Sequence, residues 1–323
     1  MIEQQIPRRD FLKTVAGAGA LAASGTFPLQ AAKKKEIPPA EKVAHSLFES
    51  LTEEQRKEIA FPFDHPLRKK VDNNWQITKP RIGQFFNKDQ QAMVDEIFRK
   101  IHSPEYADKI VGQVAHDSGS KALEKCSVGL FGEPGKDFEF VLTGRHCTRR
   151  CDGNSVKGAA FGGPIFYGHA AKGFHEEPNH PGNVYWYQAV QANRVYEMLD
   201  GEQRETALLG RSRGERGMKT IQLTGKKTDL PGIRVADLSG DQKGEMQKVM
   251  STLLSPFRKE DSDEAMKYIN ANGFDNLHMA FYKTEDTGKD GVWDVWQVEG
   301  PSMLWYFRGA PHVHTWVNIK DQA

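Results

Sequence analysis

Five stretches of the chain carry apolar residues at helical spacing, each behind a residue that can cap a helix. Four of them open with one pattern, a capping residue followed three positions later by Gln, at 52–55, 87–90, 200–203 and 239–242. The capping side chain can accept a bond from the third helical amide, and the Gln oxygen can accept one from the capping residue's own N–H. Helices are therefore predicted to begin near residues 52, 87, 200 and 239. A fifth is predicted from about residue 261 to Gly273, which suits a left-handed C-terminal cap.

The recurrence of this capping pattern has two interpretations. It could mark a repeated binding unit, or it could be one structural device used at several helices. The four occurrences are irregularly spaced and match no solenoid period, which favours the structural device.

Alternating apolar and polar residues predict strands in five other stretches, at 138–143, 277–282, 292–298, 303–308 and 312–319. Gly300-Pro301 and Gly309-Ala310 link the last three, which are therefore predicted to form an antiparallel meander. Because helices and antiparallel strands are grouped apart, the predicted fold class is α+β, an antiparallel sheet packed with several helices. No break in composition follows residue 40, so residues 41–323 are predicted to be a single domain behind a Lys- and Pro-rich linker at 33–40.

The N-terminal segment predicts export rather than a folded element. Arg8 and Arg9 precede Phe-Leu-Lys and a weakly apolar run at 14–23, an order typical of twin-arginine (Tat) signal peptides. That run is too short for a membrane-spanning helix, which needs about 20 apolar residues. We expect residues 1–32 to be a Tat signal peptide, the Tat translocase to be a partner during export, and the mature chain to be periplasmic or secreted. The alternative is an uncleaved membrane anchor, because the small-residue cleavage site near Ala31 is poor.

Composition removes several classes of protein. The 44 basic and 43 acidic residues nearly balance, which gives no support to nucleic-acid binding. The mean hydropathy of −0.62 excludes a multi-span membrane protein, and no transmembrane segment is expected in the mature chain. Three cysteines are too few for a disulfide-built mini-domain or a four-thiolate zinc site. Any ligand is expected to be a small molecule of unknown identity.

The strongest chemical signal is His312-Val313-His314 near the C-terminus. Alternate residues of a strand share a face, so the two histidines are expected to point the same way, about 7 Å apart along the backbone. A two-residue turn at Gly309-Ala310 would place His314 opposite Trp305, on an aromatic and water-poor face. Buried imidazoles need partners, and two of them suit one transition metal, Cu, Zn or Fe. The alternative is two histidines satisfied by backbone or carboxylate groups.

A closed metal site needs a third ligand, and the centre of the chain offers candidates. Four of the eleven histidines fall between residues 146 and 180, in a stretch rich in Gly and Pro. A straight strand from Phe138 would carry His146 on the same face as Phe138, which makes His146 the first candidate. The reserve ligands are His169, His175, His180 and Glu176. Nearby, Arg145 and Arg149 form a basic cluster that could hold an anion.

The cysteines give no single answer. Cys147 and Cys151 bracket three residues, so a tight disulfide, two inert thiols or a redox pair are all open, and Cys126 would be left over. The spacing differs from the C-x-x-C of thioredoxin-like sites, which disfavours redox catalysis.

Several motifs together resemble a known family. They are the Tat leader, the helix at Leu51–Arg56, the central Gly144-Arg145-His146 and the terminal His312-Val313-His314. From about residue 45 to 320 the chain resembles the bacterial exported proteins catalogued as domain of unknown function 3500. The stretches 161–169 and 305–311 resemble a planctomycete-like branch. The resemblance supports export and the pairing of His146 with the terminal histidines. The family usually has Gly-His-His-Leu where this chain has Arg145, which leaves His146 as the matching ligand.

Three functions fit these observations. The first is an exported metalloprotein or metalloenzyme with ligands His146, His312 and His314. The second is a metal-free enzyme in which a histidine acts as general base beside Arg145 or Glu176. The third is a non-catalytic ligand-binding or envelope protein whose histidines are structural.

Overall fold

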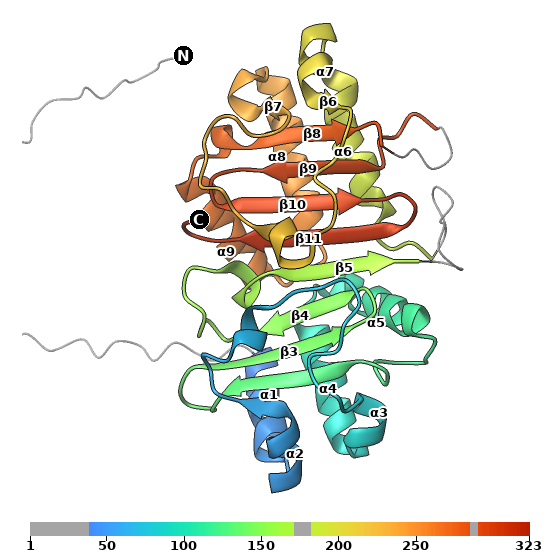
Figure 1. The fold of residues 1–323 in the computed structure, drawn as a ribbon, viewed down its shortest axis with the longest axis vertical. Coiled ribbons are helices and arrows are strands. Elements are labelled where there is room, and N and C mark those ends of the chain that lie inside the picture. Colours follow the sequence, from blue (N-terminus) through green and yellow to red (C-terminus); the bar gives the residue numbers. More distant parts are fainter. Residues whose placement is uncertain (1–38, 171–181, 285–289) are drawn as a thin grey trace, which may run out of the picture. The chain divides into compact units, whose positions relative to one another are not determined.

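A computed structural model describes residues 39–170, 182–284 and 290–323, which belong to one compact unit. Its centre is a sheet of eleven strands, antiparallel except for the two short edge pairings β1·β2 and β6·β8 (Figure 1). The strands are β1 (Ala60–Phe61), β2 (Ser127–Gly132), β3 (Phe138–Gly144), β4 (Cys147–Cys151), β5 (Ile165–His169), β6 (Leu208–Leu209), β7 (Ile233–Arg234), β8 (His278–Tyr282), β9 (Val295–Glu299), β10 (Met303–Arg308) and β11 (Val313–Ile319). The predicted α+β class and C-terminal meander are confirmed.

The helices begin where the capping pattern predicts. Thr52, Asn87, Asp200 and Ser239 each form a full capping box with the Gln three residues on. The fifth predicted helix starts two residues earlier than expected, and the helices α1, α3, α5 and α6 were not predicted. Among the described residues the α-helices are α1 (Pro39–Glu49), α2 (Glu53–Ile59), α3 (Ile82–Phe85), α4 (Lys88–Lys100), α5 (Pro104–Ser118), α6 (Trp186–Met198), α7 (Gly201–Ala207), α8 (Gly240–Leu254) and α9 (Lys259–Ala271). None of these helices is long and apolar enough to cross a membrane.

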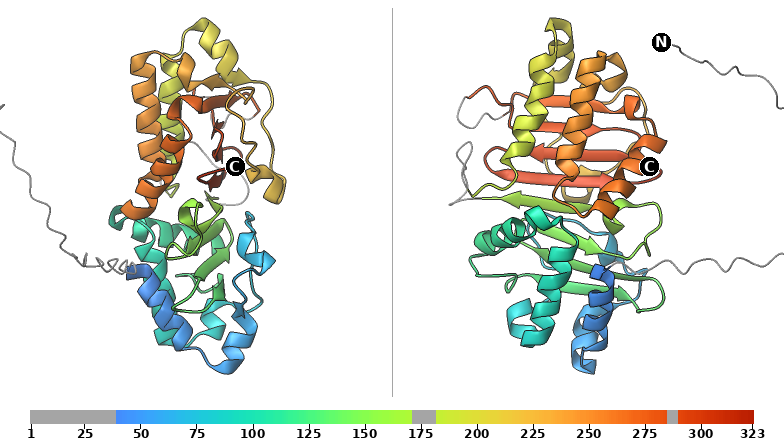
Figure 2. Two further views of the ribbon diagram at one scale, coloured as in Figure 1. Left: turned by 90° about the vertical axis from the view of Figure 1, so that its left-hand side faces the viewer. Right: turned by 180° about the vertical axis from the view of Figure 1, so that it is seen from behind.

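The long helices cover one face of the sheet, and two extended segments cover the other (Figure 2). The covering segments are residues 62–81 and 210–232. Each is held to the sheet by an arginine that reaches a buried glutamate, Arg68 to Glu139 on β3 at 3.0 Å and Arg213 to Glu299 on β9 at 3.5 Å. Because both faces are covered, the central strands are buried on both sides and their alternation is only partly polar.

The order of elements repeats within the described chain, so that its two halves form a structural duplication. Apart from α3 and β7, the series α1, α2, β1, α4, α5, β2, β3, β4, β5 is followed by the matching series α6, α7, β6, α8, α9, β8, β9, β10, β11. The strand order β1-β2-β3-β4-β5-β11-β10-β9-β8-β6 reads as the same half twice, in opposite directions. The capping boxes of α2 and α7 are equivalent, and so are those of α4 and α8. The irregular spacing that spoke against a repeat therefore reflects one duplication of a long unit with two boxes in each copy.

The four capping glutamines also join helices to each other. In the first half the side-chain amides of Gln55 and Gln90 exchange two hydrogen bonds of 3.0 Å. In the second half Gln203 and Gln242 exchange bonds of 3.1 and 2.7 Å. Gln90 and Gln242 are nearly fully buried, at 2% and 7% exposure. Loss of either side chain would leave buried backbone and amide groups without partners, which costs more than a surface bond gains.

We therefore predict that Gln90→Ala and Gln242→Ala each lower the free energy of unfolding by about 1–3 kcal/mol. Urea unfolding followed by circular dichroism measures this. Gln247→Ala is the matched control, because Gln247 is an exposed residue of α8. Equal stability of Gln242→Ala and Gln247→Ala would contradict the role of the pair.

Candidate metal centre

The terminal histidines lie at the start of β11, in the middle of the sheet. The connection from β10 is longer than the predicted two-residue turn, because the last pair of the ladder is Arg308 with His314. The register that set His314 opposite Trp305 is therefore wrong, since Trp305 pairs with Val317. The correction changes the chemistry: the neighbour of His314 on β10 is a cation instead of an indole ring.

His146 reaches the same place from the turn between β3 and β4. Strand β3 ends at Gly144, so the straight strand that was expected to carry His146 does not exist. His146 has a φ of 54°, in the left-handed region that costs a residue with a Cβ about 1–2 kcal/mol. Its amide donates to the carbonyl of Asn73 at 2.9 Å, which holds the turn against the first covering segment. Strained backbone that is held in this way is typical of functional sites.

A glycine between the strands lets the histidines meet. Gly168 on β5 pairs with His314 on β11, and the β4·β5 register continues to place His146 beside Gly168 on the other side. A Cβ on Gly168 would lie 2.2 Å from the carbonyl oxygen of Val313 and 3.5 Å from the Cβ of His146. A side chain at this position would therefore separate the two halves of the site.

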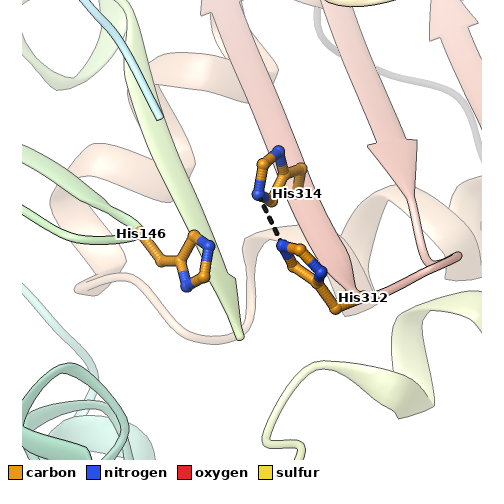
Figure 3. Close-up of side chains that lie close together, drawn as sticks. All are labelled: His146, His312 and His314. Atoms are coloured by element: carbon orange, nitrogen blue, oxygen red, sulfur yellow. Dashed lines mark hydrogen bonds between the residues drawn. The ribbon is translucent and has the colours of Figure 1, made fainter. Parts of the chain in front are cut away.

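The three imidazoles of His146, His312 and His314 form one buried cluster (Figure 3). Nitrogen atoms from all three lie within 4.8 Å of one another. The Nε2 atoms of His312 and His314 are 3.0 Å apart, and each of the three residues is 4–6% exposed. The three histidines that the sequence predicted as ligands are thus brought together by the fold.

Two carboxylates orient this cluster, Asp117, which is buried, and Glu215, which is partly buried. Asp117, near the end of α5, lies 2.7 Å from Nδ1 of His146, and its other oxygen lies 3.5 Å from Nδ1 of His169. Glu215, in the second covering segment, lies 2.7 Å from Nδ1 of His314 and accepts from the Trp316 indole at 2.6 Å. A carboxylate at Nδ1 fixes the proton there and makes Nε2 the acceptor. In His314 this nitrogen accepts a hydrogen bond of 3.0 Å from Nε2 of His312, and the same lone pair could bind a metal.

The electrostatics keep these groups in the states that a metal site needs. Burial lowers the pKa of His314 to about 3, although Glu215 beside it acts in the opposite direction. Burial would raise the pKa of Glu215, yet the hydrogen bond from His314 and the charge of Arg308 bring it to about 2. Burial also opposes ionisation of Asp117, but hydrogen bonds from His146 and His169 lower its pKa to about 2. At neutral pH the site therefore combines a neutral His314 with two carboxylates.

The cluster opens into a cavity of about 370 Å³. Besides the three histidines and Glu215, its wall contains two arginines and two asparagines, Arg145, Arg308, Asn73 and Asn74. The site is built from both halves of the duplication. The first half gives His146, Asp117 and the asparagines, and the second gives His312, His314, Glu215 and Arg308.

The other residues singled out in the sequence have different positions. His169 adjoins Asp117 behind the cluster, and its ring lies 6.0 Å from that of His116. Arg145 lines the cavity, whereas Arg149 is 2% exposed and donates to His102 and to the Phe166 carbonyl, on the helix-covered side. The reserve ligands His175, Glu176 and His180 and the leader residues Arg8 and Arg9 lie outside the described residues.

The cysteines take no part in the cluster. Cys126, Cys147 and Cys151 are buried free thiols. Burial raises the pKa of Cys147 to about 11, so its thiol stays protonated at neutral pH and is a poor nucleophile.

Sequence reasoning missed Asp117, Glu215 and Arg308. Asp117 had a weak signal, because it precedes Gly119, which ends α5 in a left-handed conformation. Glu215 lies in an irregular, Arg-rich stretch without periodicity, and Arg308 was obscured by the register error. For these two residues only the tertiary contact shows the role.

The fold and the site define a duplicated α+β protein with a three-histidine cluster backed by carboxylates. The chain belongs to the family described as "Protein of unknown function (DUF3500)", whose family model matches residues 33–321. This confirms the resemblance that the motifs suggested. No curated protein and no solved structure matches the chain.

Proposed function

We propose that the protein binds one transition-metal ion through His146, His312 and His314. The observation that carries this proposal is the convergence of three ring nitrogens within 4.8 Å, two of them on rings whose other nitrogen faces a carboxylate. Histidines that are merely buried need a hydrogen bond each, but not a common focus. Carboxylate–histidine pairs that point at one centre are typical of metal sites.

The distances are compatible with a metal of ordinary size. Zinc–nitrogen bonds of about 2.0–2.1 Å in a tetrahedral site need ligand nitrogens roughly 3.3 Å apart. The two Nε2 atoms of His312 and His314, 3.0 Å apart, are already close to this spacing. The ligand nitrogen of His146 lies within 4.8 Å of the other two and would have to move closer to complete the site. Imidazole donors suit Zn, Cu and Fe, which are the metals we propose.

The open cavity favours a catalytic site over a structural one. Structural zinc sites have four protein ligands, whereas catalytic sites keep a position for water or substrate. A metal held by three histidines supplies a Lewis acid and lowers the pKa of a bound water. The residues around it would keep His314 neutral and orient a small-molecule substrate.

Replacing His146, His312 or His314 by Ala should abolish metal binding, because two imidazoles hold a transition metal only weakly. The measurement is elemental analysis of mature protein that was exported through its own leader and purified without chelators. His45→Ala is the control, since His45 is a half-buried histidine of α1 that packs on Phe138. Full metal occupancy in the His312 and His314 variants would show that these histidines are not metal ligands.

The two carboxylates provide a second test. Asp117→Asn and Glu215→Gln keep the size of the side chain but remove the charge behind the ligand. We expect each to weaken metal affinity about 10- to 100-fold, measured by competition with a chelator. Asp108→Asn is the matched control, because Asp108 is an exposed carboxylate on the same helix α5. Unchanged affinity in both variants would show that the carboxylates do not support a metal.

A metal-free enzyme is the second candidate, and one observation favours it. Asp117 orients His146 at 2.7 Å, and the ring borders the cavity beside Arg145. This is the arrangement of a carboxylate-oriented general base. Its mark would be an activity that survives chelation and is lost in His146→Ala.

We also propose that the protein is exported through the Tat pathway. The support is the order of Arg8 and Arg9, Phe11 and the apolar run at 14–23. Tat substrates cross the membrane folded, which suits a protein that acquires its metal before export.

Exchanging Arg8 and Arg9 for Lys should leave the protein in the cytoplasm. Fractionation of cells that express the full chain measures this. A Lys33→Ala variant in the predicted linker keeps the twin arginines and should be exported normally. Normal export of the double-Lys variant would contradict the Tat route.

A further inference from the structure

The guanidinium of Arg308 carries two donors that the described residues leave unpaired. Its Nη1 lies 3.4 Å from Glu215, but its Nε and Nη2 atoms are buried and have no hydrogen-bond partner among the described residues. Buried donors of a charged group are costly to leave unpaired, about 1–3 kcal/mol or more. A bound acceptor from outside the described residues would remove this cost.

These two atoms form one edge of the guanidinium. The Nε–H and the adjacent Nη2–H point in parallel and match the two oxygens of a carboxylate. Glu215 occupies the Nη1 side and holds the group in place. Arg308 is therefore oriented by one carboxylate of the protein, and its Nε–Nη2 edge has no acceptor among the described residues.

The position of this edge links it to the histidine cluster. Arg308 pairs with His314 across the β10·β11 ladder and lines the same cavity. Arg145 stands at the mouth of the cavity as an exposed second cation. Glu215 is the single carboxylate in the described wall, and it is already engaged by His314, Trp316 and Arg308. The wall thus offers positive charge and amide groups to a ligand, without a free negative charge to repel an anion.

We infer that the cavity takes a small molecule that carries a carboxylate, held by the Nε–Nη2 edge of Arg308 with its reacting part over His146, His312 and His314. This inference names the substrate class of the proposed metal site. Only the placement of the ligand's reacting part over the three histidines rests on the proposed function. The cavity of about 370 Å³ lies at the lower end of the range for small-molecule sites. A compact organic acid fits it better than a large ligand.

Acetate is the probe for this inference, because it carries the carboxylate and little else. Its affinity is measured from the broadening of its methyl proton resonance, with the protein as purified and again after chelation. Acetamide, which has the same shape without the charge, serves as the neutral comparison. We expect acetate but not acetamide to bind both forms of the protein.

Arg308→Gln should weaken acetate binding at least tenfold in the chelated protein, where no metal contributes. Arg308→Lys keeps the charge and the contact with Glu215 but removes the fork, and we expect a loss of at least threefold. If Arg308→Gln does not fold, Arg308→Lys alone tests the inference. Arg194→Gln, an exposed arginine on α6, is the matched control and should bind like the wild type.

The outcomes separate this inference from the proposed function. Equal acetate affinity in wild type and both Arg308 variants would overturn the carboxylate site, even if the protein holds metal stoichiometrically. Inorganic phosphate that displaces acetate with a higher affinity would overturn the assignment to carboxylates. If the purified protein holds no metal but binds acetate in a way that depends on Arg308, the carboxylate site is supported and only the metal proposal is overturned.

Discussion

The antiparallel pairing of β5 with β11 is the contact on which the rest of the structure depends. It joins the two copies of the duplicated unit into one sheet and gives each copy a covered central strand in place of an open edge. It also sets His314 beside Gly168, and through Gly168 beside His146. Neither copy has the three histidines by itself, so the cluster exists only because this ladder forms in this register.

The two halves share one scaffold, and the histidine cluster depends on the differences between them. Both copies use a hydrogen-bonded pair of glutamines between helices, one of them buried, and an arginine–glutamate contact that holds a covering segment to the sheet. The cluster uses these equivalent parts unequally. The first covering segment fixes the backbone of His146 through Asn73, and the second supplies Glu215 as a charged partner of His314. A symmetric scaffold thus carries an asymmetric centre.

The balance of charge in the centre is consistent with its proposed chemistry. Burial keeps His314 neutral, and two carboxylates stay ionised because the imidazoles donate to them. A divalent cation among neutral imidazoles would meet Asp117 and Glu215 at the far ends of two rings. On the open side Arg308 and Arg145 would face an anion. In the described wall, Glu215 is thus paired with Arg308, and the two arginines would also face the proposed anionic ligand.

Local sequence determined the parts of this protein whose causes are local. The capping boxes, the meander strands and the identity of His146, His312 and His314 follow from neighbouring side chains and from alternation along a strand. The tertiary structure decided what depends on distant contacts. The register of β10 against β11 follows from packing rather than from the turn at Gly309. The end of β3 is set where the amide of His146 bonds to Asn73. The roles of Asp117, Glu215 and Arg308 come from contacts between segments far apart in the chain. A pattern of single residues does not determine which segments far apart in the chain will lie side by side, because the free energy of that choice is spread over the whole core.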